Sequence, residues 1–239
     1  MFEPGTVWSW GPFTVPVLWM GMLVGIIGGY YLLARIGHKQ QLPTVKPFLD
    51  TITSAALIGV LIYKLWPLVE QTDIFIRNPA ALLLYSGGAY AAEAAGIASA
   101  GWFLYRGIRG KWLGWQAAEW LFAGSVLLLL SKAVFVKEYG VSASWGWELA
   151  GNTYIPLNLI DLVLYLSLLV VAYVFFVKKT VATRDRVGIL LVGLGLAGLI
   201  RGLWRVPAAD TLLWGMTLPE LLLVAALLVG VTLLLLPKK

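Results

Sequence analysis

Seven stretches of this 239-residue chain are apolar over about the length that a bilayer-crossing helix requires. They cover residues 15–34, 48–68, 80–105, 113–134, 155–177, 187–204 and 218–236. Backbone N–H and C=O groups in hydrocarbon find partners only inside a helix or a closed barrel. Because the runs are continuously apolar and not alternating, they favour helices. The sequence therefore predicts an all-α, polytopic membrane helix bundle with seven transmembrane helices.

Composition supports a bilayer as the solvent of this chain. The sequence is 60% hydrophobic and 13% charged, whereas a soluble domain carries about 25% charged residues. The longest stretch outside the apolar runs, residues 137–154, is too short for a soluble head domain. We therefore expect residues 1–239 to form a single integral membrane domain, with any chemistry in or near the membrane.

The distribution of Lys and Arg predicts the orientation. Twelve of these cations lie in the first, third and fifth connections and at the C-terminal end, and three lie on the opposite side. Cytoplasmic loops carry the excess of Lys and Arg. The bias places the N-terminus outside and the C-terminus in the cytoplasm, which requires an odd number of spans. The expected location is the inner, or plasma, membrane.

Several site classes are excluded by composition. The chain has no cysteine and one histidine, His38, which excludes disulfides, thiolate zinc sites, iron–sulfur clusters and covalent haem. No Ser/His/Asp set, HExxH motif or phosphate loop is recognisable. We expect no cofactor and no metal site. The net charge of +6 reflects membrane orientation better than nucleic-acid binding, because the cations lie in short loops.

Eight ionisable side chains fall inside the predicted spans, where a charge costs about 2.5–3.5 kcal/mol on insertion scales. They are Asp50, Lys64, Glu93, Glu119, Lys132, Asp161, Arg201 and Glu220. Snorkelling or a helix dipole accounts for five of them, which lie near predicted helix ends. Glu93, near the middle of the third run, and Arg201, inside the sixth, could neutralise each other as a pair. A structural pair and a lipid-headgroup site are both compatible with this pattern.

Two further patterns concern packing and the membrane boundary. Small residues are dense at 86–96 and 188–198, and such surfaces let helices approach closely. We interpret them first as packing surfaces, with the lining of a lipid cavity as the alternative. Trp and Tyr recur near the ends of the runs, including Trp8, Trp10, Trp145 and Trp147. This is typical of an interfacial aromatic belt.

Local motifs occurring in order along the chain resemble one family of membrane enzymes. They are GPFTV at 11–15 with WMG at 19–21, Asp50 with Gly59 and KL at 64–65, NP at 78–79 with GG at 87–88, Lys111 with Glu119, IPLNLID at 155–161, RVP at 205–207 and GMTLPE at 215–220. The chain is similar to the prolipoprotein diacylglyceryl transferases, which move diacylglycerol from phosphatidylglycerol to a lipobox cysteine. The resemblance implies seven spans, an external N-terminus and a cytoplasmic C-terminus.

The chain departs from the family pattern at the positions that carry the family's catalytic and headgroup-binding residues. The family's histidine after GG corresponds to Ala92, with Glu93 beside it, and the histidine that opens the 155–161 motif corresponds to Ile155. The family's arginine- and asparagine-containing signature falls on residues 129–140, where Lys132 is the nearest cation, and Arg201 lies one residue from another family position. In the family these groups bind the phosphatidylglycerol headgroup and activate the thiol.

Three functional hypotheses follow. The first is a divergent, non-catalytic family member that binds a phospholipid or a membrane-protein partner. Phosphatidylglycerol is one candidate for the phospholipid. The second is an active transferase with a rebuilt site, with Glu93 as the base. The third is a membrane subunit or small transporter in which Glu93 and Asp161 form a polar pathway. The candidate headgroup-binding residues are Lys132, Asn158, Asp161, Arg201 and Arg205. Whether the chain is an enzyme stays open at this point.

Overall fold

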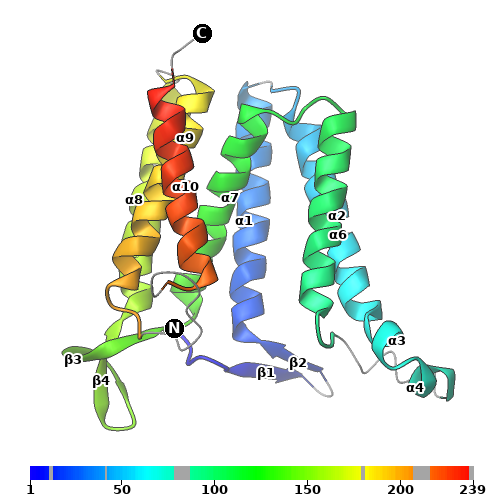
Figure 1. Cartoon of the computed structure of the whole chain (residues 1–239), viewed down its shortest axis with the longest axis vertical. Coiled ribbons are helices and arrows are strands. Elements are labelled where there is room, and N and C mark those ends of the chain that lie inside the picture. The colour runs from blue at the N-terminus through cyan, green and yellow to red at the C-terminus, as the bar shows by residue number, and fades with distance from the viewer. Residues whose placement is uncertain (11–12, 41, 78–86, 179–180, 207–215, 237–239) are drawn as a thin grey trace. The chain divides into compact units, whose positions relative to one another are not determined.

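The computed structural model describes residues 1–10, 13–40, 42–77, 87–178, 181–206 and 216–236. This part of the chain is mostly helical (Figure 1). Its helices of 18 residues or more are α1 (Val17–Gln40), α2 (Val45–Leu65), α6 (Ala91–Arg109), α7 (Trp115–Phe135), α8 (Leu157–Lys178), α9 (Thr183–Gly202) and α10 (Leu218–Leu235). Two short helices, α3 (Pro67–Glu70) and α4 (Thr72–Arg77), follow α2.

Four helical segments are long and apolar enough to cross a membrane. They are Val17–Lys39, Val45–Glu70, Trp115–Phe135 and Leu157–Phe175, and α10 contributes a shorter apolar helix. The predicted helical, membrane-type fold is therefore confirmed. The sequence places α1, α2, α7, α8, α9 and α10 to within about six residues at each end. Seven spans and the orientation of the ends stay predictions.

The third apolar run differs most from its prediction. The helix expected over residues 80–105 is α6, which begins at Ala91 and continues to Arg109, and residues 78–86 lie outside the described part. Gly87, Gly88 and Tyr90, which directly precede α6, have positive φ angles that are incompatible with a right-handed helix. Glu93, expected near the middle of a span, instead lies in the first turn of α6. There a carboxylate meets the positive end of the helix dipole, so the expectation of a mid-span charge was wrong.

The chain divides into two compact units, Met1–Leu33 with Ala118–Lys239, and Ala34–Ala117. Within the second unit, α2 packs against α6. Ser99 Oγ donates to the Ala55 carbonyl at 3.0 Å, and Trp102 Nε1 donates to Ser54 Oγ at 2.9 Å. Both bonds cross from α6 to α2, and they help to fix how the two helices face each other. That residues 1–239 form one membrane domain stays a prediction.

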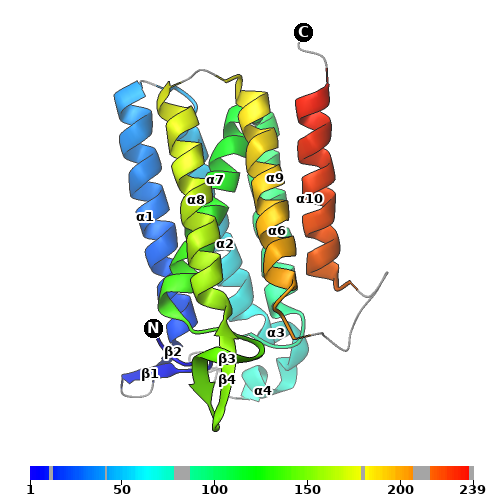
Figure 2. The same ribbon diagram turned by 90° about the vertical axis from the view of Figure 1, so that its left-hand side faces the viewer.

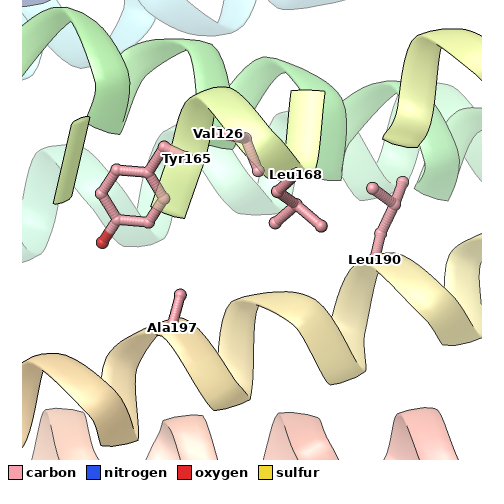
Figure 3. Packing of buried hydrophobic residues seen from close by; sticks show 5 residues of the cluster. All are labelled: Val126, Tyr165, Leu168, Leu190 and Ala197. Carbon is pink, nitrogen blue, oxygen red and sulfur yellow. The ribbon is translucent and has the colours of Figure 1, made fainter. Parts of the chain in front are cut away.

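The core of the first unit lies among α7, α8 and α9. Val126 of α7, Tyr165 and Leu168 of α8, and Leu190 and Ala197 of α9 form one buried apolar cluster (Figure 3). Leu190 and Ala197 project from the same side of α9 toward the other three side chains (Figure 3). The cluster packs α7, α8 and α9 together. This packing fixes the positions of the charged residues at the ends of the three helices.

Small residues bring α9 close to α10, which lies beside it (Figure 2). A Cβ built on Gly188 would lie 3.1 Å from the Gly230 carbonyl oxygen, and one on Gly230 would lie 2.7 Å from the Gly188 carbonyl oxygen. The interpretation of residues 188–198 as a packing surface is therefore confirmed. In the 86–96 stretch the approach is uneven: a Cβ on Gly87 would lie 2.5 Å from the Tyr63 hydroxyl oxygen, whereas one on Gly96 would meet open space.

Two antiparallel hairpins in the first unit were not predicted. One pairs β1 (Val7–Trp10) with β2 (Phe13–Pro16), and the other pairs β3 (Tyr139–Leu149) with β4 (Asn152–Pro156). The fold is therefore not purely α-helical. Each hairpin is followed without a linker by a long helix, α1 or α8.

The N-terminal residues tie the two hairpins to the same end of the first unit. The Phe2 amide donates to the Phe135 carbonyl at 2.8 Å, and the Lys137 amide donates to the Phe2 carbonyl at 2.9 Å. The hydroxyl of Ser131, in the last turns of α7, donates to the Gly21 carbonyl in α1. The first turns of α1, the end of α7 and the start of β3 therefore lie together.

The close packing of α9 on α10 predicts that Gly195→Ala is destabilising. An added Cβ would lie 2.6 Å from Leu227 Cβ and 2.8 Å from the Leu223 carbonyl oxygen. We expect a loss of about 1–3 kcal/mol in the free energy of unfolding, measured by denaturation in detergent. Gly101→Ala in α6 is the control, because its Cβ would meet nothing within 4 Å and alanine favours a helix. Equal effects of the two substitutions would contradict the packing described.

Candidate functional site

Four charged side chains meet at one end of the α7, α8 and α9 group. Lys132 Nζ lies 2.5 Å from Glu138 Oε1, and Arg201 Nη2 pairs with Glu138 Oε2. Arg201 Nε also lies 3.0 Å from Asp161 Oδ2. We call these four residues the Arg201 cluster. It contains two cations and two carboxylates, so its formal charge is balanced.

Each member reaches the cluster from a different element. Lys132 lies in the last turn of α7 and Arg201 in the last turn of α9. Asp161 lies in the second turn of α8, and Glu138 follows α7 just before β3 begins. The helices thus deliver one group each, and the connection from α7 to β3 supplies the carboxylate that joins the two cations.

The cluster is partly open to its surroundings, through Lys132, Arg201 and Glu138. The side chains of Lys132 and Arg201 are 30% and 25% exposed, whereas that of Asp161 is 8% exposed. Asp161 Oδ1 is buried and has no hydrogen-bond partner among the described residues. The arrangement therefore combines accessible cations with an inner carboxylate oxygen that can still accept a hydrogen bond.

The ionisation of Glu138 fixes the charge of the cluster. Burial raises the pKa of this carboxyl, but the hydrogen bond from Lys132 and the positive charge of Arg201 outweigh it, so the pKa lies below its ordinary value. Glu138 is therefore a carboxylate at neutral pH. A carboxylate held in this way is a weak base and a strong acceptor for two cations.

Asn158 supports the cluster from behind. Its side chain is fully buried, and its Oδ1 accepts hydrogen bonds from Trp147 Nε1 at 2.9 Å and from the Glu138 amide at 3.4 Å. Its Nδ2 donates to Met1 Sδ at 3.1 Å and to the Ala133 carbonyl at 3.4 Å. Asn158 thus links α8 to α7, β3 and the N-terminus directly beside Glu138.

A second ion pair lies at the opposite end of the same three helices. Arg186 Nη2, near the start of α9, lies 3.3 Å from Glu119 Oε2 near the start of α7, and Arg186 Nη1 donates to the Phe175 carbonyl of α8 at 3.5 Å. At 1.5 Å per residue, Glu119 and Lys132 are about 20 Å apart along α7. Because the hydrocarbon layer is about 30 Å thick, both ionic sites would lie close to or inside its margins.

The structure brings together most of the residues that the sequence singled out as binding residues. Lys132, Asp161 and Arg201 are members of one cluster, and Asn158 adjoins it. Arg205 is exposed beyond the end of α9 and takes part in none of the ion pairs of the cluster. Glu93 belongs to the other compact unit. Its pairing with Arg201 stays a prediction, but Arg201 already has two carboxylate partners.

Sequence reasoning missed Glu138, which connects the two cations. It lies in a segment interpreted as an outer connection, outside the predicted spans, so it was not counted among the charges that need a partner. The signal available was its position a few residues beyond Lys132 at the end of an apolar run. A cation near the end of a span favours a carboxylate in the adjoining connection.

No protein-family model matches the chain, and no curated protein sequence matches it significantly. The similarity to the prolipoprotein diacylglyceryl transferases therefore stays a prediction. Within the described residues, no group of three or more His, Cys, Asp or Glu side chains is placed to hold a metal ion. The functional argument rests on the cluster itself.

We predict that Glu138→Gln destabilises the first unit. The amide cannot neutralise Lys132 and Arg201, which lie in partly apolar surroundings. We expect a loss of about 1–3 kcal/mol in the free energy of unfolding, below the value for a fully buried pair because the group is partly exposed. Glu148→Gln, at an exposed position in β3 and without an ion pair among the described residues, is the control. Similar small effects from both would show that the cluster contributes nothing to stability.

The lowered pKa of Glu138 also predicts a pH dependence. A carboxyl whose pKa is lower in the folded than in the unfolded protein stabilises the fold above its unfolded pKa of about 4.3. That contribution is lost as the pH falls through the folded-state pKa. The stability difference between wild type and Glu138→Gln should therefore shrink on acidification, as followed by thermal unfolding in detergent. A difference that stays constant with pH would contradict the assignment.

Proposed function

We propose that this chain is a seven-span membrane protein, with an external N-terminus and a cytoplasmic C-terminus, that binds a phospholipid headgroup at the Arg201 cluster. The distribution of Lys and Arg supports this topology. So does the pairing of Phe2 with residues 135–137, because the proposal places four spans between them. Arg184 Nη2 donates to the Leu236 carbonyl, which sets the end of α10 beside the start of α9, as the same topology requires.

The observation that carries the binding proposal is the convergence of two accessible cations on one carboxylate. A phosphodiester offers a negative charge and several acceptor oxygens, and Lys and Arg are the side chains that recognise it. Arg presents five N–H donors, and the contacts of Arg201 with Glu138 and Asp161 involve Nη2 and Nε. The guanidinium can therefore donate to a phosphate while it remains paired.

The two carboxylates reduce the cost of placing two cations in apolar surroundings. Two unpaired cations near hydrocarbon would be costly, and Glu138 and Asp161 neutralise them. A phosphate that approaches from the exposed side would first contact Lys132, the most exposed member of the cluster. It would replace Glu138 as the partner of Lys132 and leave Glu138 with Arg201.

Lipid binding suits this site better than diacylglyceryl transfer. A transferase must activate a thiol, which requires a base or a strong positive field. The pKa of Glu138 lies below its ordinary value because of Lys132 and Arg201, so this carboxylate is a weak base.

The proposal predicts that Lys132→Gln reduces the amount of phospholipid that copurifies with the protein. Loss of one charge-assisted hydrogen bond of about 1.5–3 kcal/mol corresponds to about tenfold weaker binding or more. Native mass spectrometry from mild detergent, with phosphatidylglycerol and phosphatidylethanolamine added in turn, measures the bound fraction.

Lys137→Gln is the matched control. Lys137 is also partly exposed at this end, but it pairs with Glu3 at 2.7 Å and lies outside the cluster. Both variants lose one positive charge, and unfolding curves establish that both remain folded. We expect lipid loss from Lys132→Gln alone. Equal retention, or equal loss, in the two folded variants would contradict a headgroup site at the cluster.

A further inference from the structure

The β1–β2 hairpin presents an apolar face that the described chain leaves uncovered. In its register Trp8 lies opposite Val15 and Trp10 opposite Phe13. Residues directly opposite each other, and residues two apart on one strand, share a face of a sheet. Trp8, Trp10 and Val15 therefore lie on one face, and they are 65%, 89% and 41% exposed. Ser9 and Val7, the latter 52% exposed, lie on the other face.

The hairpin adjoins a segment that is long and apolar enough to cross a membrane. β2 ends at Pro16 and α1 begins at Val17, the first residue of the candidate span Val17–Lys39. Exposed apolar side chains continue along α1, including Leu23 and Ile27. No charged residue occurs between Glu3 and Arg35. The hairpin therefore lies next to the end of α1 at which the hydrocarbon layer would begin. It carries no charged side chain that would favour water over lipid.

Backbone hydrogen bonding determines how deep the hairpin can lie. It has two strands, so each strand has one edge whose N–H and C=O groups are not paired within the sheet. Such groups are not tolerated in hydrocarbon, where each would cost several kcal/mol. Water and lipid headgroups can satisfy them. Tryptophan also favours this boundary, because its ring is largely apolar and carries one N–H donor.

We propose that the β1–β2 hairpin is a membrane-surface anchor. It lies flat at the boundary between headgroups and acyl chains, with Trp8, Trp10 and Val15 toward the acyl chains and Ser9 toward water. Its partner is the lipid surface of the same bilayer that α1 enters. This inference rests on the membrane-spanning topology of the proposed function and is independent of lipid binding at the Arg201 cluster.

The absence of cysteine from the chain permits a direct depth measurement. Single variants Trp10→Cys, Ser9→Cys and Ile27→Cys, each carrying a nitroxide label, are reconstituted in nanodiscs of phosphatidylcholine and phosphatidylglycerol. Collision rates with O2, which concentrates in lipid, and with a water-soluble nickel chelate report the depth of each label. We expect the ratio of O2 to nickel collisions to be severalfold higher at position 10 than at position 9, and highest at position 27.

Val15→Cys provides a second test of the same face, because it leaves both tryptophans of β1 in place. The anchor is overturned if labels at positions 10 and 15 are as accessible to the nickel chelate as a label at position 9. It is also overturned if both labels are shielded from both reagents, as in a protein contact. If position 27 excludes the nickel chelate and positions 10 and 15 do not, the anchor fails and the topology stands. If position 27 is itself in water, the proposed topology fails.

Discussion

A charged side chain near the hydrocarbon of a bilayer needs a partner of opposite charge, and this requirement organises the first compact unit. α7, α8 and α9 meet through an apolar cluster around Val126 and Leu168, which by itself would tolerate small rotations of each helix. Ion pairs at both ends of these helices restrict such rotation. Buried ion pairs often add little net stability, so we assign these pairs chiefly the role of fixing which helix faces meet.

The two ionic sites differ in access, and this difference separates a structural pair from a candidate binding site. Glu119 and Arg186 are 5% and 12% exposed, so this pair is largely closed to its surroundings. The cations of the Arg201 cluster are partly exposed, and its inner carboxylate Asp161 has an oxygen that no described residue engages. The same electrostatic requirement thus produces a closed pair at one end and an accessible site at the other.

Much of this arrangement follows from the sequence, because hydropathy governs where long helices form in lipid. The helices that became α7 and α8 were predicted to within two residues of their starts, and Lys132, Asp161 and Arg201 were recognised as charges that need an explanation. Their meeting point could not be derived, since it depends on the rotation of each helix. Glu138 was missed because it lies just beyond a span.

Local backbone geometry explains the other differences. The start of α6 is set by positive φ angles at Gly87, Gly88 and Tyr90, which an apolar run alone does not reveal. Both hairpins lie in segments interpreted as span edges or connections. The alternation in Val7–Trp10, followed by Gly11 and Pro12 before β2, is a hairpin pattern. The pattern was not recognised because these residues are apolar and directly adjoin the first predicted span.

The most direct measurement is an experimental density map of the protein in a lipid nanodisc. We predict density for a phospholipid phosphate within hydrogen-bonding distance of Lys132 or Arg201, with the acyl chains extending along α7 or α9. A map in which Lys132, Glu138, Asp161 and Arg201 contact only one another and water, while ordered lipids occupy other surfaces, would contradict headgroup binding at this cluster.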